Sequence, residues 1–192
     1  MIYFGAINII LDKYYLGMQS QITTKRMKKV FVAYKSQFHI IKMAMWISRG
    51  VKSTGIEVVT KEISEIKSLE EITGFDGYIL GASSDKGNIA PRFESFMTSI
   101  QDFDATYKLV GSFSGYSESI DKGIGGQAAA IILDYMVNKF NMRPFHLGPL
   151  RVRTSPSPLD TGSPDSLRIP DESLLECTNY GEIFGYALLS QP

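Results

Sequence analysis

The stretch Val30–Phe38, VFVAYKSQF, decides the fold because it reads as a short buried strand that runs into a polar turn. Its first five residues are apolar or aromatic and include two β-branched valines, which is typical of a strand covered on both faces of a parallel sheet. Short runs of the same kind recur along the chain, with turn residues at their ends. The predicted strands are Val30–Tyr34, Ile56–Thr60, Tyr78–Gly81, Tyr107–Phe113 and Leu147–Val152.

Longer stretches between and after these runs show helical periodicity. They predict helices over Ile40–Val51, Leu69–Thr73, Arg92–Phe103, Gly125–Phe140 and Asp171–Leu189. Parallel strands need crossover connections, and helices supply them. The alternation therefore predicts an α/β fold of three layers, in which helices cover both faces of a five-stranded parallel sheet with strand order 2-1-3-4-5.

Composition excludes several classes of function. The 192 residues suit one domain, and 20 Lys and Arg balance 20 Asp and Glu, so no net charge attracts nucleic acid or an anionic membrane. One Cys cannot form an internal disulfide, and the two His are far apart in sequence. We therefore predict no metal site in this chain.

The first 27 residues differ from the rest and are interpreted as an N-terminal extension or the remnant of a linker, with the domain itself over residues 28–192. The apolar run at the start stops at Asp12. It is too short to span a bilayer and lacks the features of a signal peptide. The sequence thus predicts a cytoplasmic protein with no membrane association.

Three loops should meet at one edge of the sheet, because ligands of open parallel sheets bind outside the carboxyl ends of the strands. These loops are Lys35–Ile41, Ala82–Pro91 and Ser112–Gly123, and the last two are rich in Ser and Gly. Every charged residue in the stretch 25–52 is basic. The first loop, followed by a helix N-terminus, is therefore the expected place for a phosphate.

The sequences around these loops are VFVAYKSQF, DGYILGASSDKGNIAP and LVGSFSGYSESID, and in order and spacing they resemble the flavodoxin-like FMN-binding module. The likeness is greatest to the version carried by flavodiiron proteins (A-type flavoproteins) and runs from about Lys29 to Leu189. It implies FMN as cofactor and electron transfer as activity. The residues it implies as cofactor-binding are Ser36, Gln37, Phe38, His39, Ile41, Ser84, Asn88, Ser112, Phe113, Ser114, Gly115 and Tyr116.

The match departs from the family pattern at four of these positions. His39 stands where the phosphate loop has Gly, and Ile41 stands where it has a second hydroxyl. A Cβ at the Gly position can block close approach of the backbone to a phosphate, although a His could itself donate to the phosphate. Gly115 takes the place of a Trp, and Tyr116 supplies an aromatic ring one residue later.

Two functions from different classes follow. The first is an FMN-binding electron-transfer module of flavodiiron type that works with a redox partner protein, either a reductase or a di-iron domain, and that could form a homodimer. The second is a flavodoxin-like domain that has lost FMN and acts as a structural or interaction module. No independent catalytic site is evident, and an NAD-dependent enzyme is disfavoured because no Gly-x-Gly-x-x-Gly follows the first strand.

Overall fold

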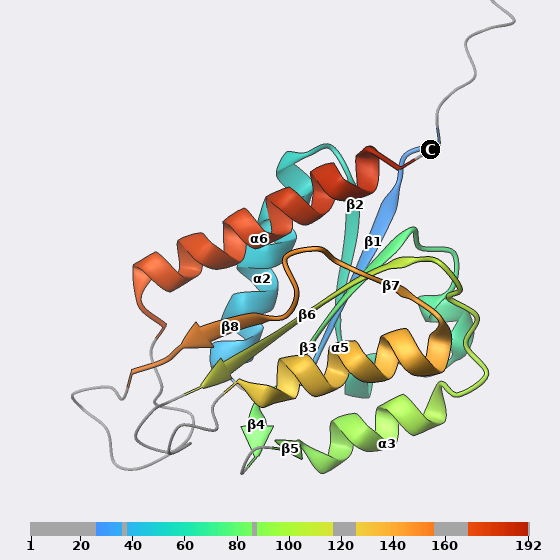
Figure 1. The fold of residues 1–192 in the computed structure, drawn as a ribbon, viewed down its shortest axis with the longest axis horizontal. Coiled ribbons are helices and arrows are strands. Elements are labelled where there is room, and N and C mark those ends of the chain that lie inside the picture. The colour runs from blue at the N-terminus through green and yellow to red at the C-terminus, as the bar shows by residue number, and fades with distance from the viewer. Residues whose placement is uncertain (1–25, 36–37, 86–87, 117–125, 156–168, 192) are drawn as a thin grey trace, which may run out of the picture.

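The computed structural model describes residues 26–35, 38–85, 88–116, 126–155 and 169–191. A parallel sheet forms its centre, with strand order β2-β1-β3-β6-β7 and with β8 also paired to β6 (Figure 1). This confirms the predicted order 2-1-3-4-5. The strands of this sheet are β1 Lys29–Tyr34, β2 Glu57–Glu62, β3 Gly77–Gly81, β6 Leu109–Tyr116, β7 Arg143–Pro144 and β8 Leu150–Arg153.

The fifth position of the sheet is divided between two short strands, so the prediction of one strand over Leu147–Val152 was wrong in its bounds. β7 pairs with the start of β6, and β8 pairs with its end. Between them the chain turns at Gly148, whose φ of 70° is left-handed and whose N–H donates to the Phe145 carbonyl at 2.8 Å. Pro144 and Pro149 flank this turn, and each lacks the N–H that a ladder needs.

Two further predicted elements differ from the structure. The stretch predicted as a helix over Leu69–Thr73 forms a single 3₁₀ turn, η2 Leu69–Ile72, preceded by another, η1 Ile63–Glu65. The run is too short for an α-helix to propagate, and left-handed Gly74 follows it. The fourth predicted strand begins later and ends later than expected, because Tyr107 has a left-handed φ of 62° and pairing with β8 extends β6 to Tyr116.

The helices form one layer on each face of the sheet (Figure 1). One layer consists of α2 and α6, and the other of α3 and α5 together with the two 3₁₀ turns. Alternate β1 residues enter the two cores: Val30 and Val32 face the first layer, and Phe31 and Ala33 face the second. The helices span α2 Phe38–Ser53, α3 Pro91–Ser99, α5 Gln127–Phe140 and α6 Asp171–Leu189, and α6 has the predicted bounds.

Helices α2 and α6 approach so closely that two positions at the contact have no space for a side chain and are occupied by glycine. A Cβ placed on Gly181 would meet the Ile47 carbonyl, and one placed on Gly50 would meet the Thr178 carbonyl. Cys177, on the same face of α6, is fully buried. Burial raises the pKa of its thiol to about 12, which keeps it protonated at neutral pH.

The two ends of the described chain lie together. The Lys28 ammonium, just before β1, donates to the carbonyls of Leu188 at 2.7 Å and Gln191 at 2.9 Å. A cation at this position satisfies carbonyls that the last turn of a helix leaves without intrahelical partners. Among the helices in the described ranges, none is long and apolar enough to cross a bilayer.

Candidate functional site

The carboxyl ends of β1, β3 and β6 meet at one edge of the sheet, as the three-loop prediction required. The Lys35 N–H donates to the Gly81 carbonyl at 2.9 Å, and the Ala82 N–H donates to the Phe113 carbonyl at 3.3 Å. These bonds tie the ends of β1 and β3 to each other and to Phe113, three residues before the end of β6. The loops after Lys35 and Ala82 therefore start next to one another, and β6 runs past them at the same edge to Tyr116.

The first loop leads directly into the N-terminus of α2. Ser36 and Gln37 lie outside the described residues, and Phe38 opens the helix, although its side chain is not described. The first turn of α2 contains no acidic residue, so nothing there opposes the positive end of the helix dipole. Ile41, one turn into the helix, is half-buried. This is the arrangement of backbone donors that favours an anion.

The imidazole of His39 is buried against Gly115 of β6. Its side chain is 3% exposed, and a Cβ built on Gly115 would lie 2.6 Å from His39 Cδ2 and 3.2 Å from Nε2. The imidazole therefore takes the space that a side chain at position 115 would need. Two of the departures from the expected pattern, His39 and Gly115, are therefore in contact. The larger side chain at position 39 fills the space left by the missing side chain at position 115.

The serines of β6 have their side chains inside the protein. Ser112 and Ser114 are fully buried, and their hydroxyls donate to the carbonyls of Ala129 at 2.7 Å and Gly126 at 3.1 Å. Their visible role is to fix the start of α5 against the sheet. Phe113 is also fully buried, and its ring covers the Cα of Gly81, where a Cβ would strike it.

Tyr116 ends β6 at the edge where the loops meet, and it is half-buried. Thr154, which follows β8, donates to the Tyr116 carbonyl twice, from its N–H at 2.7 Å and from its hydroxyl at 2.8 Å. Sequence reasoning missed Thr154, because a threonine at the start of a Pro-rich loop carries no signal of its own. These bonds fix the backbone from which the Tyr116 ring projects.

The second loop forms a small antiparallel hairpin between β3 and α3, which the sequence did not predict. Its strands are β4 Ser84–Asp85 and β5 Asn88–Ile89. Ser84 and Asn88 thus belong to the same hairpin at the carboxyl edge, although their side chains are outside the description. The later part of the third loop, residues 117–125, also lies outside the described residues.

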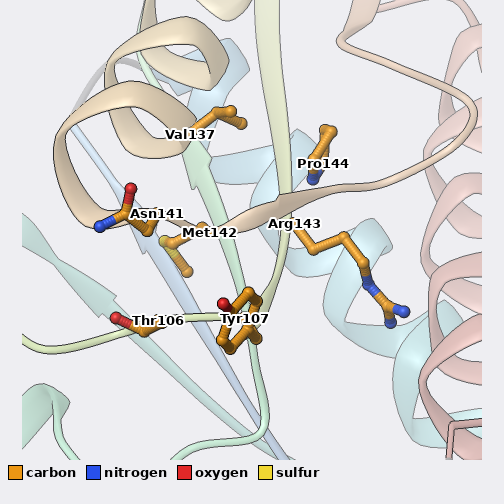
Figure 2. Close-up of a pocket in the computed structure, with 7 residues that line it drawn as sticks. All are labelled: Thr106, Tyr107, Val137, Asn141, Met142, Arg143 and Pro144. Carbon is orange, nitrogen blue, oxygen red and sulfur yellow. The ribbon is translucent and has the colours of Figure 1, made fainter.

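A cavity of about 580 Å³ lies at the opposite edge of the sheet (Figure 2). Its lining includes Tyr107 and Arg143, which precede or begin β6 and β7, so it opens at the amino ends of the strands. Tyr107 is 81% exposed, and its N–H donates to the carbonyl of Asn141 at 3.0 Å. Ligands of this sheet type bind at the carboxyl edge, so this cavity is not the expected cofactor site.

Electrostatics at the carboxyl edge favour a neutral phenol at the end of β1. Burial raises the pKa of Tyr34 above its ordinary value of 10.0, and the nearby carboxylates of Glu65 and Glu62 raise it further. Within the part of the chain that the structure describes, no group of three or more His, Cys, Asp or Glu side chains could hold a metal ion.

Comparisons with known proteins give both sequence relatives and structural neighbours. No family model matches the sequence. The chain is similar to an NAD(P)H dehydrogenase (quinone) of Sinorhizobium fredii, with 30% identity over 126 aligned positions, and to one of Rhizobium rhizogenes, with 29% identity. Each alignment covers 55% of this chain and 63% of the relative, so the chain spans less than two thirds of the length of the curated relatives it matches.

Solved structures of two kinds superpose on the chain. A flavodoxin from the domain Archaea gives a TM-score of 0.66 at 19% identity and covers 84% of this chain and 99% of its own. The Flv1 flavodiiron core from Synechocystis sp. PCC6803 gives the same TM-score and identity, covering 93% of this chain and 40% of its own. The strand order, the two helical layers and these superpositions together show that the chain has the flavodoxin-like fold.

Proposed function

We propose that this chain binds FMN without a covalent bond at the carboxyl edge of its sheet and transfers electrons. The observation that carries the proposal is the meeting of three strand ends with the N-terminus of α2, in a fold shared with flavodoxins and flavodiiron cores. Bound FMN would supply the redox chemistry, and the protein would position it and tune its potential.

The described residues fit this cofactor at some points and differ from the family pattern at others. The N-terminus of α2 can receive the phosphate through backbone N–H groups, and the first turn of this helix contains no acidic residue. Tyr116 is the aromatic side chain at the end of β6 and would flank the flavin ring. Ser112 and Ser114 act indirectly, since they hold α5 and β6 in place beneath the site.

Titration of the purified chain with FMN tests the proposal. We expect flavin fluorescence to be quenched with saturation at micromolar concentration. Tyr116→Ala should weaken binding by several-fold, because an aromatic contact is worth about 0.5–1.5 kcal/mol. Tyr107→Ala is the matched control, since Tyr107 lies at the opposite edge and should leave the affinity unchanged. Absence of quenching in the unmodified chain would overturn the proposal.

The finer assignment concerns the redox partner. The structural likeness to flavodiiron cores supports a module that receives electrons from a reductase or passes them to a di-iron domain. The sequence likeness to NAD(P)H dehydrogenases (quinone) supports a second candidate, in which the FMN-loaded chain itself passes electrons from NAD(P)H to a quinone. This second candidate is a nicotinamide-dependent enzyme, the class that the sequence disfavoured because no Gly-x-Gly-x-x-Gly follows the first strand.

Steady-state assays separate these two candidates. The FMN-loaded chain is mixed with NADPH or NADH and a water-soluble benzoquinone, with and without an added flavin reductase. Consumption of the reduced nucleotide without the reductase supports the quinone dehydrogenase function. Electron flow that appears only with the reductase supports the module. Sedimentation velocity on the same sample tests the possible homodimer.

The alternative of a domain that has lost FMN is tested at the contact between His39 and Gly115. Gly115→Trp alone should destabilise the fold, because the imidazole already occupies the space beside Gly115. The double variant His39→Gly/Gly115→Trp restores the family pattern and should recover stability. If FMN binds only to the double variant, the natural chain is the form without cofactor; equal binding to both leaves the FMN proposal standing.

A further inference from the structure

A second cavity, of about 360 Å³, lies between the end of β1, the turn η1 and helix α3. Its walls combine apolar side chains with hydroxyl and cationic groups from three separate parts of the sequence. A cavity of this volume is in the range that holds a small organic molecule. The lining residues are Lys35, Ile63, Ser64, Ile66, Arg92, Ser95, Phe96 and Ser99.

The alternation of β1 explains why this cavity belongs to the second layer. Phe31 and Ala33 face the layer of α3, so Lys35, two residues further, points to the same side. Its side chain is only 18% exposed, and its ammonium lies 3.8 Å from the nearest Glu62 carboxylate oxygen. That separation is longer than a hydrogen bond, so a mostly buried cation keeps capacity for another partner.

Arg92 supplies a second positive charge from the first turn of α3. It is exposed, and no ion pair to it is found among the described residues. Glu62 pairs with Lys35, and Glu65 lies beside Glu62, so among the described residues the cation at the cavity without an ion-pair partner is the Arg92 guanidinium. Arg presents several N–H donors in a plane, a shape that matches a carboxylate.

The serine hydroxyls of α3 use their hydrogens within the helix and face the cavity as hydrogen-bond acceptors. Ser95 donates to the Pro91 carbonyl at 3.0 Å, and Ser99 donates to the Phe96 carbonyl at 2.7 Å. Each hydroxyl has one hydrogen, so toward the cavity both oxygens can only accept. Phe96 and the two isoleucines Ile63 and Ile66 supply an apolar surface between these polar groups.

We propose that this cavity binds a flat aromatic acid that also carries a hydroxyl or amino group. The acid group would lie between Lys35 and Arg92, the ring against Phe96, and the donor against the serine oxygens of α3. The inference goes beyond the proposed flavin function and does not depend on it, since Lys35 faces away from the layer of α2.

Titration followed by ¹H–¹⁵N NMR of the full chain tests this proposal. The probe is 3-hydroxy-2-naphthoate, and 2-naphthol is the matched probe without the carboxylate. We expect saturable shifts at the amides of Ser64, Ile66 and Ser99 with the naphthoate. Arg92→Gln should weaken naphthoate binding about tenfold, because a hydrogen bond to a charged group is lost. Binding of 2-naphthol should be the same in both proteins.

The control is Arg143→Gln, which removes an exposed Arg at the other edge of the sheet and should leave naphthoate binding unchanged. Equal affinity for the two probes, or no effect of Arg92→Gln, would overturn the assignment of an anionic ligand. Shifts confined to residues 38–42 and 82–83 would place the probe at the proposed flavin site instead of this cavity and would also overturn it. FMN titration of the same samples gives an independent result, so failure of one proposal is distinguishable from failure of the other.

Discussion

The two helical layers of this protein cover the same sheet with different kinds of packing. In the layer of α2 and α6, glycines bring two helix backbones into direct contact. In the layer of α3 and α5, aromatic rings and two 3₁₀ turns fill the space, and a cavity remains beside α3. The first layer has no room for added atoms at its contact, whereas the second can accept a ligand. The difference teaches that one sheet can support a rigid face and an adaptable face.

Substitution of Gly181 should break the first layer and give the largest effect. In a helix without a close neighbour, Gly→Ala stabilises by about 1 kcal/mol. Here the added methyl group would meet the Ile47 carbonyl, so Gly181→Ala should lower the free energy of unfolding by about 3 kcal/mol. Urea denaturation measures the change.

A small-to-large substitution in the second layer is the matched control. Ser95→Leu, on the cavity wall of α3, should cost less than about 1 kcal/mol because the cavity accepts the added carbons. A stabilising Gly181→Ala, or equal losses for the two variants, would contradict the contrast between the layers.

Among the described residues, each layer has one buried tyrosine, Tyr180 in the first layer and Tyr78 in the second, and these two extend the comparison. Tyr180 of α6 donates to the Gly148 carbonyl at 2.9 Å and accepts from the Ser112 N–H at 3.2 Å, whereas Tyr78 of β3 donates to the Ile72 carbonyl at 2.9 Å and has only a weaker polar contact with the backbone of Phe75. Tyr180→Phe should therefore cost about 2 kcal/mol and Tyr78→Phe about 1 kcal/mol at pH 7, measured by chemical denaturation.

Alkaline pH gives a second measure of the same hydroxyls. Burial raises the pKa of both phenols above their ordinary value of 10.0. At pH values between the unfolded and the folded pKa, the folded state binds more protons than the unfolded state. The contribution of each buried phenol to the free energy of unfolding is therefore complete below pH 10 and is lost as the pH rises further. Each Phe variant should make the decline above pH 10 shallower. A decline as steep as that of the unmodified chain would show that the phenol is not responsible.

The smallest effect is expected outside both layers, at Tyr107. Its left-handed φ of 62° is unfavourable for a tyrosine, and its ring is 81% exposed, so few contacts compensate. Tyr107→Asn should raise the free energy of unfolding by about 0.5 kcal/mol, because Asn tolerates this conformation. Asn141→Ala, at a second non-glycine residue with a left-handed φ among those described, should lower the free energy of unfolding. A loss of stability in Tyr107→Asn would mean that the ring packs more than its exposure indicates.

The sequence was most informative where the signal is local. Buried runs such as Val30–Tyr34 and the period of α6 predicted their elements, and the order of the strands followed from crossover rules. The pairing of segments that are distant in sequence was harder to predict from the sequence. The split of the fifth strand depends on how β7 and β8 register with β6, and no local pattern encodes that pairing.

The candidate site shows the same limit. The three loops were found from turn residues after strands, and the structure brings their starts together. The burial of Ser112 and Ser114 was not foreseen, because it depends on where β6 ends and on the position of α5. Nor could the sequence show that His39 and Gly115 touch, although both departures were visible in it.

The bonds from Lys28 to the end of α6 have a consequence for engineering. They hold the first and last described residues side by side, at the corner of the fold away from the carboxyl ends of the strands (Figure 1). A domain whose ends meet can be inserted into a loop of a host protein, or circularly permuted through a short linker, with little distortion. Such fusions would leave the edge where the three loops meet open to a partner.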